Sequence, residues 1–133
     1  MSKNFYLSIF FILFFNVISA QNPIEWITNS EKINDSTYNL ITTAKIENNW
    51  RLYSQYNEEG GAILTEFIFS DSLIIKNYSK VIEPEPITKF DPVFNLDQSY
   101  FVNQVTFNQR IVLSDNDVDF VNQTVYYQVC DDR

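Results

Sequence analysis

The stretch YNLITTAKI, residues 38–46, decides the fold class, because its character alternates at every second position. Alternate side chains of a β-strand point to the same face, so a strand with one buried face shows a period of two. The stretch VTFNQRIVL, residues 105–113, repeats the pattern and is also rich in β-branched residues. The side chains predicted to share a buried face are Tyr38, Leu40, Thr42, Ala44 and Ile46 in the first stretch and Val105, Phe107, Gln109, Ile111 and Leu113 in the second.

Outward from these two stretches, short segments of the same kind recur between residues that favour turns. We expect further strands at residues 50–53, 65–69, 73–77 and 119–129, and no helix after residue 20. About seven short strands in a chain of this size predict an all-β fold, an immunoglobulin-like β-sandwich. The aromatic side chains expected to fill its core are Trp26, Phe67, Phe69 and Phe107.

The first twenty residues have the three parts of a signal peptide. Lys3 supplies the positive charge, residues 5–15 are almost entirely apolar, and Ile18-Ser19-Ala20 provides a cleavage site before Gln21. The apolar run is shorter than the roughly 18 residues of a membrane span. We therefore predict a cleaved signal peptide at residues 1–20, followed by one exported domain at residues 21–133 that does not insert into the membrane. An uncleaved membrane anchor is the alternative.

Charge and composition exclude several classes of partner. Residues 21–133 carry eight Lys and Arg against 17 Asp and Glu, a formal net charge of −9, which repels nucleic acid and anionic lipid. The chain has no histidine and one cysteine, so we expect no metal and no cofactor. Asp115, Asp117 and Asp119 could be calcium ligands, but the segment lacks the Gly and the Glu of a calcium loop and is more typical of a turn.

Two stretches depart from the strand pattern. Residues 55–62 form a polar segment with the only two glycines of the chain, Gly60 and Gly61. Residues 83–95 hold three of the four prolines together with Phe90, Val93 and Phe94. A rigid loop that presents aromatic side chains can cover a functional site. An ordinary long connection with its aromatics tucked beneath it is the alternative.

The side chain with the clearest potential for chemistry is Cys130, at the end of the last expected strand. A single cysteine in an exported protein suggests pairing or a free reactive thiol, although a small buried apolar residue is the alternative. Asp131 and Asp132 follow it, Arg133 only partly offsets their charge, and negative charge disfavours a thiolate. We therefore expect Cys130 to be the receiving end of thiol–disulfide exchange, attacked by a partner's thiolate once it is oxidised with a second cysteine.

Several segments, in order, resemble the N-terminal periplasmic domain of the thiol:disulfide interchange protein DsbD, in its Bacteroidetes-type form. The similarity covers essentially all of residues 21–133, and no single motif in it is highly specific. The segments are NWRLYSQ (49–55), EGG (59–61), TEF (65–67), VIEPEP (81–86), KFDPVF (89–94), YF (100–101), VTF (105–107) and YYQVCDD (126–132).

The resemblance implies a periplasmic immunoglobulin-like domain with a redox cysteine pair. Such a domain takes electrons from a membrane-linked thioredoxin-like domain and passes them to periplasmic disulfide isomerases or cytochrome-maturation thioredoxins. By position, Cys130 matches the first cysteine of the pair. Residues 91–95 match the cap loop, which begins at Asp91 and carries Phe94 as its covering aromatic, and Tyr53 and Trp50 match the strand beside the site.

One departure from that pattern concerns the C-terminus. The family places a second cysteine a few residues after the first and then adds a strand, whereas this sequence stops at Arg133. We therefore expect a fragment of a longer protein or a truncated gene product, which could form a mixed disulfide but no disulfide of its own. A cysteine within about six residues after Arg133 would favour redox work. Its absence would favour a non-catalytic, exported immunoglobulin-like binding module, so enzymatic activity stays undecided at this point. A secreted glycoprotein is a third reading, on the Asn-X-Ser/Thr triplets at Asn34, Asn77 and Asn122.

Overall fold

The computed structural model describes residues 22–70, 73–115 and 117–131, so the predicted signal peptide lies outside the described residues. The described residues form strands and connections and contain no helix. None of them therefore forms a helix of the length and apolar character that a membrane span requires. The strands are β1 (Ile24–Lys32), β2 (Thr37–Ile46), β3 (Trp50–Tyr53), β4 (Glu66–Phe69), β5 (Ile75–Tyr78), β6 (Ile87–Asp91), β7 (Leu96–Phe101), β8 (Gln104–Leu113), β9 (Gln123–Tyr126) and β10 (Val129–Asp131).

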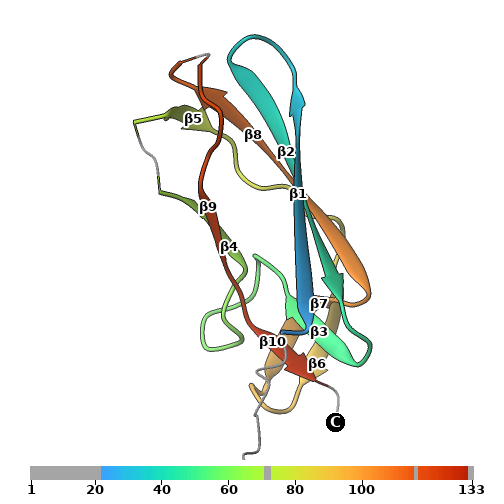
Figure 1. Ribbon diagram of the computed structural model, residues 1–133. Coiled ribbons are helices and arrows are strands. Elements are labelled where there is room, and N and C mark those ends of the chain that lie inside the picture. The colour runs from blue at the N-terminus through green and yellow to red at the C-terminus, as the bar shows by residue number, and fades with distance from the viewer. Residues whose placement is uncertain (1–21, 71–72, 116, 132–133) are drawn as a thin grey trace, which may run out of the picture.

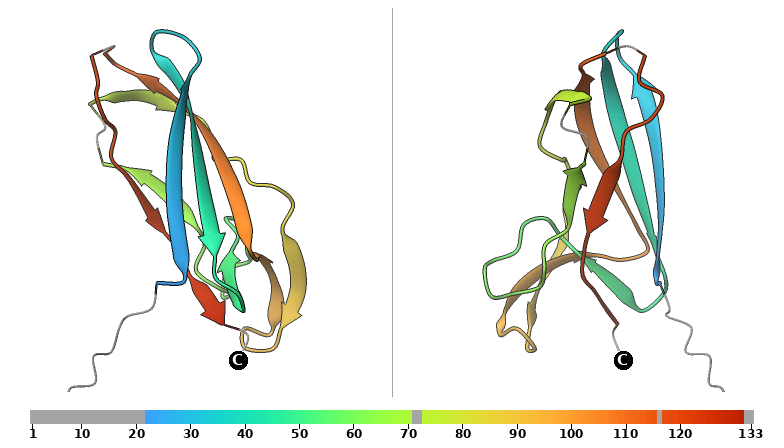
Figure 2. Two further views of the ribbon diagram at one scale, coloured as in Figure 1. Left: turned by 45° about the vertical axis from the view of Figure 1, so that its right-hand side comes forward. Right: turned by 60° about the vertical axis from the view of Figure 1, so that its left-hand side comes forward.

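The strands pair into three antiparallel sheets. One is four-stranded with the order β1-β2-β8-β5, one is four-stranded with the order β10-β3-β7-β6, and β4 pairs with β9 alone. Figure 1 shows β3, β6, β7 and β10 gathered at one end of the long sheet, with β5 at the other end. Both views of Figure 2 place the β6–β7 hairpin (gold to brown) at the same end as β10 (red). The immunoglobulin-like β-sandwich that the sequence predicts is confirmed.

The two stretches with the clearest alternation, β2 and β8, are neighbours in the long sheet. Thr42 lies opposite Phe107 and Ala44 opposite Val105, so the predicted buried faces meet across one pair of strands. Leu40, Thr42, Ala44 and Ile46 of β2 are buried, as are all five predicted positions of β8. Tyr38 is half-buried, so nine of the ten predicted positions are buried, as expected for strands in which burial of one face imposes the period of two.

The main core lies between the long sheet and the sheet that contains β3. Phe107 is its centre, at 1% exposure, with the ring centroids of Phe67, Phe101 and Trp26 at 5.0, 6.0 and 6.2 Å. Leu52 of β3 is fully buried in the same cluster. A second apolar cluster around Ile111 joins the far end of the long sheet to Phe69 and to residues that precede β9. The four aromatics expected in the core all pack against these two clusters.

The structure departs from the predicted strands in three places. Residues 119–129 do not form one strand, because β9 ends at Tyr126 and β10 begins at Val129 after an interruption. The Pro-rich stretch is not a loop throughout, since β6 occupies residues 87–91 and pairs with the unpredicted β7. The sequence also gave no sign of β1. Both β1 and β6 are edge strands with mostly exposed side chains, so neither shows the apolar alternation of a half-buried strand.

Candidate functional site

The outer face of the β10-β3-β7-β6 sheet, opposite the main core, carries Cys130. Antiparallel pairing sets Cys130 opposite Arg51 on β3, and Tyr53 opposite Tyr100 on β7. Directly opposed residues share a face, as do residues two apart on one strand, so these four side chains lie on the same side of the sheet. Leu52 and Phe101 alternate with them and point into the main core.

A small apolar cluster covers this outer face. Tyr53, Ala62 and Tyr100 are its buried members, and Tyr53 has no exposed surface. Phe94 and Cys130 are partly buried and pack against the cluster. Cys130 is a free thiol, and its Sγ donates a hydrogen bond to the backbone carbonyl of Asp131 at 3.4 Å. The sulfur is therefore placed at the rim of a packed aromatic cluster.

Tyr53 is the link between the cysteine and the cap loop that the resemblance implies. Its hydroxyl donates to Oδ2 of Asp91 over 3.5 Å, a long hydrogen bond. Its ring meets Phe94 edge-on, with the centroids 6.1 Å apart and an interplanar angle of 88°. This edge-to-face arrangement is the favoured geometry for an aromatic pair. Tyr53, Asp91, Phe94 and Cys130 are thus brought together in the fold.

The cap loop is the turn between β6 and β7. Asp91 ends β6 and is buried, and its Oδ1 accepts a hydrogen bond from the backbone N–H of Val93 at 2.8 Å. Asn95 closes the turn with a φ of 56°, a left-handed conformation that asparagine tolerates better than most residues. The Asp91 carboxylate therefore fixes the turn with one oxygen and faces Tyr53 with the other, while Val93 at the tip is 81% exposed.

Trp50 lies elsewhere. It sits opposite Asp131 on the other face of β3, and its ring packs against the main core with Trp26 and Phe67. The structure therefore does not bring Trp50 together with the other predicted site residues. Asp132 and Arg133, whose charges enter the prediction for Cys130, lie outside the described residues. The cation that the fold does bring to the site is Arg51, whose guanidinium lies 4.7 Å from the centroid of the Tyr100 ring.

The environment of Tyr53 keeps its phenol neutral. Burial is the largest cause that raises the pKa of Tyr53 well above its ordinary value, followed by the charges of Cys130 and Asp91 and a hydrogen bond with Cys130. The guanidinium of Arg51 opposes this rise in pKa to a smaller extent. At neutral pH the hydroxyl of Tyr53 is thus a hydrogen-bond donor held beside the sulfur.

The raised pKa of Tyr53 predicts a loss of stability at high pH. Above about pH 10, the ordinary pKa of tyrosine, the unfolded chain releases a proton that the folded protein retains. We expect the free energy of unfolding to fall by up to roughly 1.4 kcal/mol per pH unit from this group alone. Urea unfolding between about pH 8 and about pH 11 measures the slope, and Tyr53→Phe removes this share of it. An unchanged slope in Tyr53→Phe contradicts the prediction.

Sequence reasoning missed a second group of residues on the outer face. Gln98 and Gln128 hold the loop between β3 and β4 through its backbone, at Ala62 and Ile63. Gly60 has a φ of 89°, which glycine adopts without strain. The pair Gly60-Gly61 was the available signal, since it marked this loop as special without saying what it covers.

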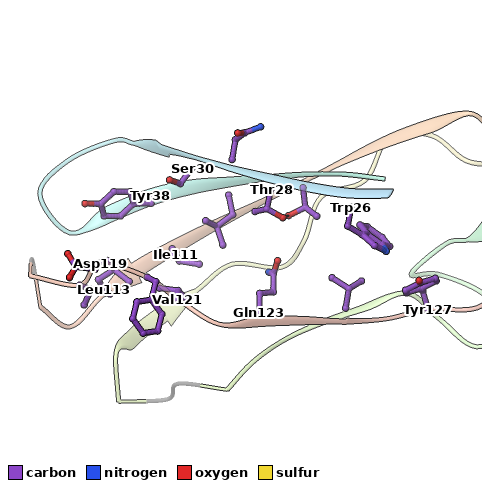
Figure 3. Close-up of a pocket in the computed structure, with 16 residues that line it drawn as sticks. Trp26, Thr28, Ser30, Tyr38, Ile111, Leu113, Asp119, Val121, Gln123 and Tyr127 are labelled. Carbon is purple, nitrogen blue, oxygen red and sulfur yellow. The ribbon is translucent and has the colours of Figure 1, made fainter. Parts of the chain in front are cut away.

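A cavity of about 580 Å³ lies away from this group, between the inner face of the long sheet and residues 118–127. Figure 3 shows Trp26 and Tyr127 at one end of it and Tyr38, Leu113 and Asp119 at the other. The Nε1 atom of Trp26 is buried and has no hydrogen-bond partner among the described residues. None of Tyr53, Asp91, Phe94 and Cys130 lines this cavity.

The acidic segment considered for calcium has the form of a turn in the described residues. The backbone N–H of Asp117 donates to Oδ1 of Asp115 at 3.2 Å. Among residues 22–70, 73–115 and 117–131, no three Cys, Asp or Glu side chains gather in a way that could hold a metal ion.

The fold has a counterpart among solved structures. It is similar to the N-terminal periplasmic domain of ScsB from Proteus mirabilis, with a TM-score of 0.60 and 16% sequence identity. The similarity covers 84% of this chain and 47% of that one, so the match spans about half the length of the similar protein. No family model and no curated protein sequence matches the chain. The described residues thus share the β-sandwich fold of a periplasmic N-terminal domain.

Proposed function

We propose that this protein is a periplasmic thiol–disulfide exchange domain in which Cys130 is the reacting residue. The observation that carries the proposal is the contact of the free thiol of Cys130 with a cluster in which Tyr53 is fully buried and hydrogen-bonded to Asp91. An incidental surface cysteine needs no such surroundings. The hydroxyl of Tyr53 has one proton, which it donates to Asp91 over a long hydrogen bond and can redirect to the sulfur when a thiolate forms at Cys130, which stabilises the charge that appears during exchange.

In the reaction, one sulfur–sulfur bond breaks as another forms. Electrons reach the site when the thiolate of the supply partner attacks Cys130 while it is oxidised with a second cysteine. They leave the site when the thiolate of Cys130 attacks one sulfur of an acceptor partner's disulfide, a bond forms between Sγ and that sulfur, and the acceptor's own S–S bond breaks. The released partner sulfur takes up a proton. To complete the two-electron transfer, a second thiol must then attack the mixed disulfide between Cys130 and the partner and release one of them. This second thiol comes from outside the 133 residues, which hold one cysteine.

The partners we propose are thioredoxin-like domains. A membrane-linked one supplies the electrons, and periplasmic disulfide isomerases or cytochrome-maturation thioredoxins accept them. The resemblance to DsbD supports this choice, and the fold shared with the periplasmic domain of ScsB supports the compartment. The formal net charge of −9 for residues 21–133 also favours a protein partner over a nucleic acid or an anionic membrane.

Trapping of a mixed disulfide tests the proposal. A thioredoxin-like protein with its resolving cysteine replaced by serine is loaded with thionitrobenzoate on its attacking cysteine, so that exchange with Cys130 releases the coloured thiolate and leaves a stable protein–protein disulfide. We expect this disulfide to form at least about tenfold faster than with an unrelated protein that carries the same group on a surface cysteine, because docking places the sulfurs in line.

Cys130→Ser is the control, and it must abolish both the colour and the cross-linked species. Equal rates with the thioredoxin-like carrier and the unrelated carrier contradict the proposal. That outcome would leave an exported immunoglobulin-like binding module in which the cysteine is incidental.

A further inference from the structure

The loop between β3 and β4 crosses over β3 and covers the outer face of the sheet. Its residues 60–63 form a second wall over this face, besides the turn that carries Phe94. The backbone N–H of Ala62 donates to Oε1 of Gln98 at 2.8 Å, and the N–H of Ile63 donates to Oε1 of Gln128 at 2.6 Å. Gln98 lies on β7 and Gln128 immediately precedes β10, the two neighbours of β3 in the sheet. Two consecutive residues of the loop are therefore held from opposite sides of β3.

Several contacts fix this loop to β7. Gln98 has no exposed surface, and its Nε2 donates to the backbone carbonyl of Asp97 at 2.8 Å. Asn57 exchanges two hydrogen bonds with the backbone of Ser99, at 3.0 and 2.6 Å. A β-carbon on Gly61 would lie 2.5 Å from Nε2 of Gln98, so the loop backbone rests directly on that amide. This side of the wall is anchored by the buried amide of Gln98 and by the half-buried side chain of Asn57.

The contact on the Cys130 side passes through Gln128, which is half-buried. The backbone N–H of Tyr53 donates to its carbonyl at 3.3 Å, which continues the β10–β3 register and sets Gln128 opposite Tyr53. Gln128 also precedes Cys130 by two residues in an extended chain, so both side chains lie on the outer face. Its amide therefore ties the wall to the strand that carries the sulfur.

We propose that Gln128 is a positioning residue, which holds Ile63 and thereby keeps the wall of residues 60–63 closed against the Cys130 strand. The inference rests on the proposed function, in which Sγ of Cys130 reacts, and it names the group that sets how large a reagent can reach that sulfur. Gln128 acts through Ile63 and not on the sulfur. When the Gln128 bond is lost, Gln98 and Asn57 still hold the other side of the loop, so the wall opens at the edge that faces Cys130.

Gln128→Ala in the otherwise unchanged protein tests this inference with two measurements. Amide hydrogen exchange at Ile63 should rise about fivefold, the effect of one lost hydrogen bond, while the amide of Ala62 keeps its protection. Alkylation of Cys130 is followed with iodoacetamide and with a maleimide attached to a long polyethylene glycol chain. We expect the ratio of the bulky to the small rate to rise about fivefold. Both reagents need the thiolate, so the ratio cancels any change in the ionisation of the sulfur.

Two further variants complete the test. Gln128→Glu keeps an acceptor oxygen at the same place and should restore the wild-type ratio. Gln123→Ala removes a glutamine of β9 that bonds Gln109 at 3.1 Å, and it should leave the ratio unchanged. An unchanged ratio in Gln128→Ala, or an equal rise in Gln123→Ala, overturns the inference.

The two proposals fail in different ways. If Cys130 exchanges with the thioredoxin-like carrier while Gln128→Ala leaves the ratio unchanged, the positioning role of Gln128 alone is overturned. If the ratio rises but no mixed disulfide forms, the proposed function fails, and the claim that this wall serves disulfide exchange fails with it.

Discussion

Phe107→Ala should lower the free energy of unfolding by about 3–5 kcal/mol, the usual cost of removing a fully buried aromatic side chain. Phe107 is 1% exposed and lies against Trp26, Phe67 and Phe101, with ring centroids 5.0 to 6.2 Å away. The truncated side chain leaves a cavity between the two sheets that these rings cannot all fill. Since domains of this size are stable by about 5–15 kcal/mol, the loss is a large share of the total.

Urea unfolding followed by tryptophan fluorescence measures this loss, and Phe90→Ala is the matched control. Phe90 is 60% exposed on the edge strand β6, so its removal should change the free energy of unfolding by no more than about 0.5 kcal/mol. A loss below about 1 kcal/mol in Phe107→Ala would mean that the ring is not the centre of the core.

Phe94→Ala should speed the alkylation of Cys130 by iodoacetamide about tenfold, because it removes the aromatic wall that lies against Tyr53. The edge-to-face pair of Phe94 and Tyr53 holds the β6–β7 turn over the cluster that includes Cys130. Such a pair contributes about 0.5–1.5 kcal/mol beyond the apolar area that it buries, and 1.4 kcal/mol corresponds to a factor of ten in the open population.

The alkylation rate follows from the mass shift of the intact protein with time. Val93→Ala is the control in the same turn, since its side chain is 81% exposed and its loss should leave the rate unchanged. Equal rates in Phe94→Ala and the wild type would contradict the assignment of this turn as the cap of the site. A further increase in the double variant with Gln128→Ala would indicate that the two walls act separately.

The strands of this protein differ in how far their own sequence predicts them. The buried faces of β2 and β8 could be predicted because each strand has one face in the core and one in solvent, which leaves its mark at every second residue. The strands β6 and β7 could not be predicted in this way. The first four residues of β6 are all exposed, and β7 buries the polar side chain of Gln98. Neither strand therefore shows apolar residues at every second position.

The candidate site shows the same division. Cys130, Tyr53, Asp91 and Phe94 could be selected from the resemblance, and the fold does bring them together. The resemblance also selected Trp50, whose side chain lies on the other face of β3, in the core. Trp50 and Tyr53 are an odd number of residues apart in one strand, so their side chains point to opposite faces of the sheet, and a match by position alone does not apply this alternation.

The sequence by itself determined the all-β fold class, the acidic net charge and the presence of a single thiol, because local alternation and composition carry this information. Only the tertiary structure decided that Gln128 lies opposite Tyr53 and that its side chain reaches Ile63, 65 residues away in the chain. These contacts arise when strands distant in sequence pair and a loop closes over them. A glutamine in a polar setting gives no local sign of such a role, since its amide can bond equally well to water.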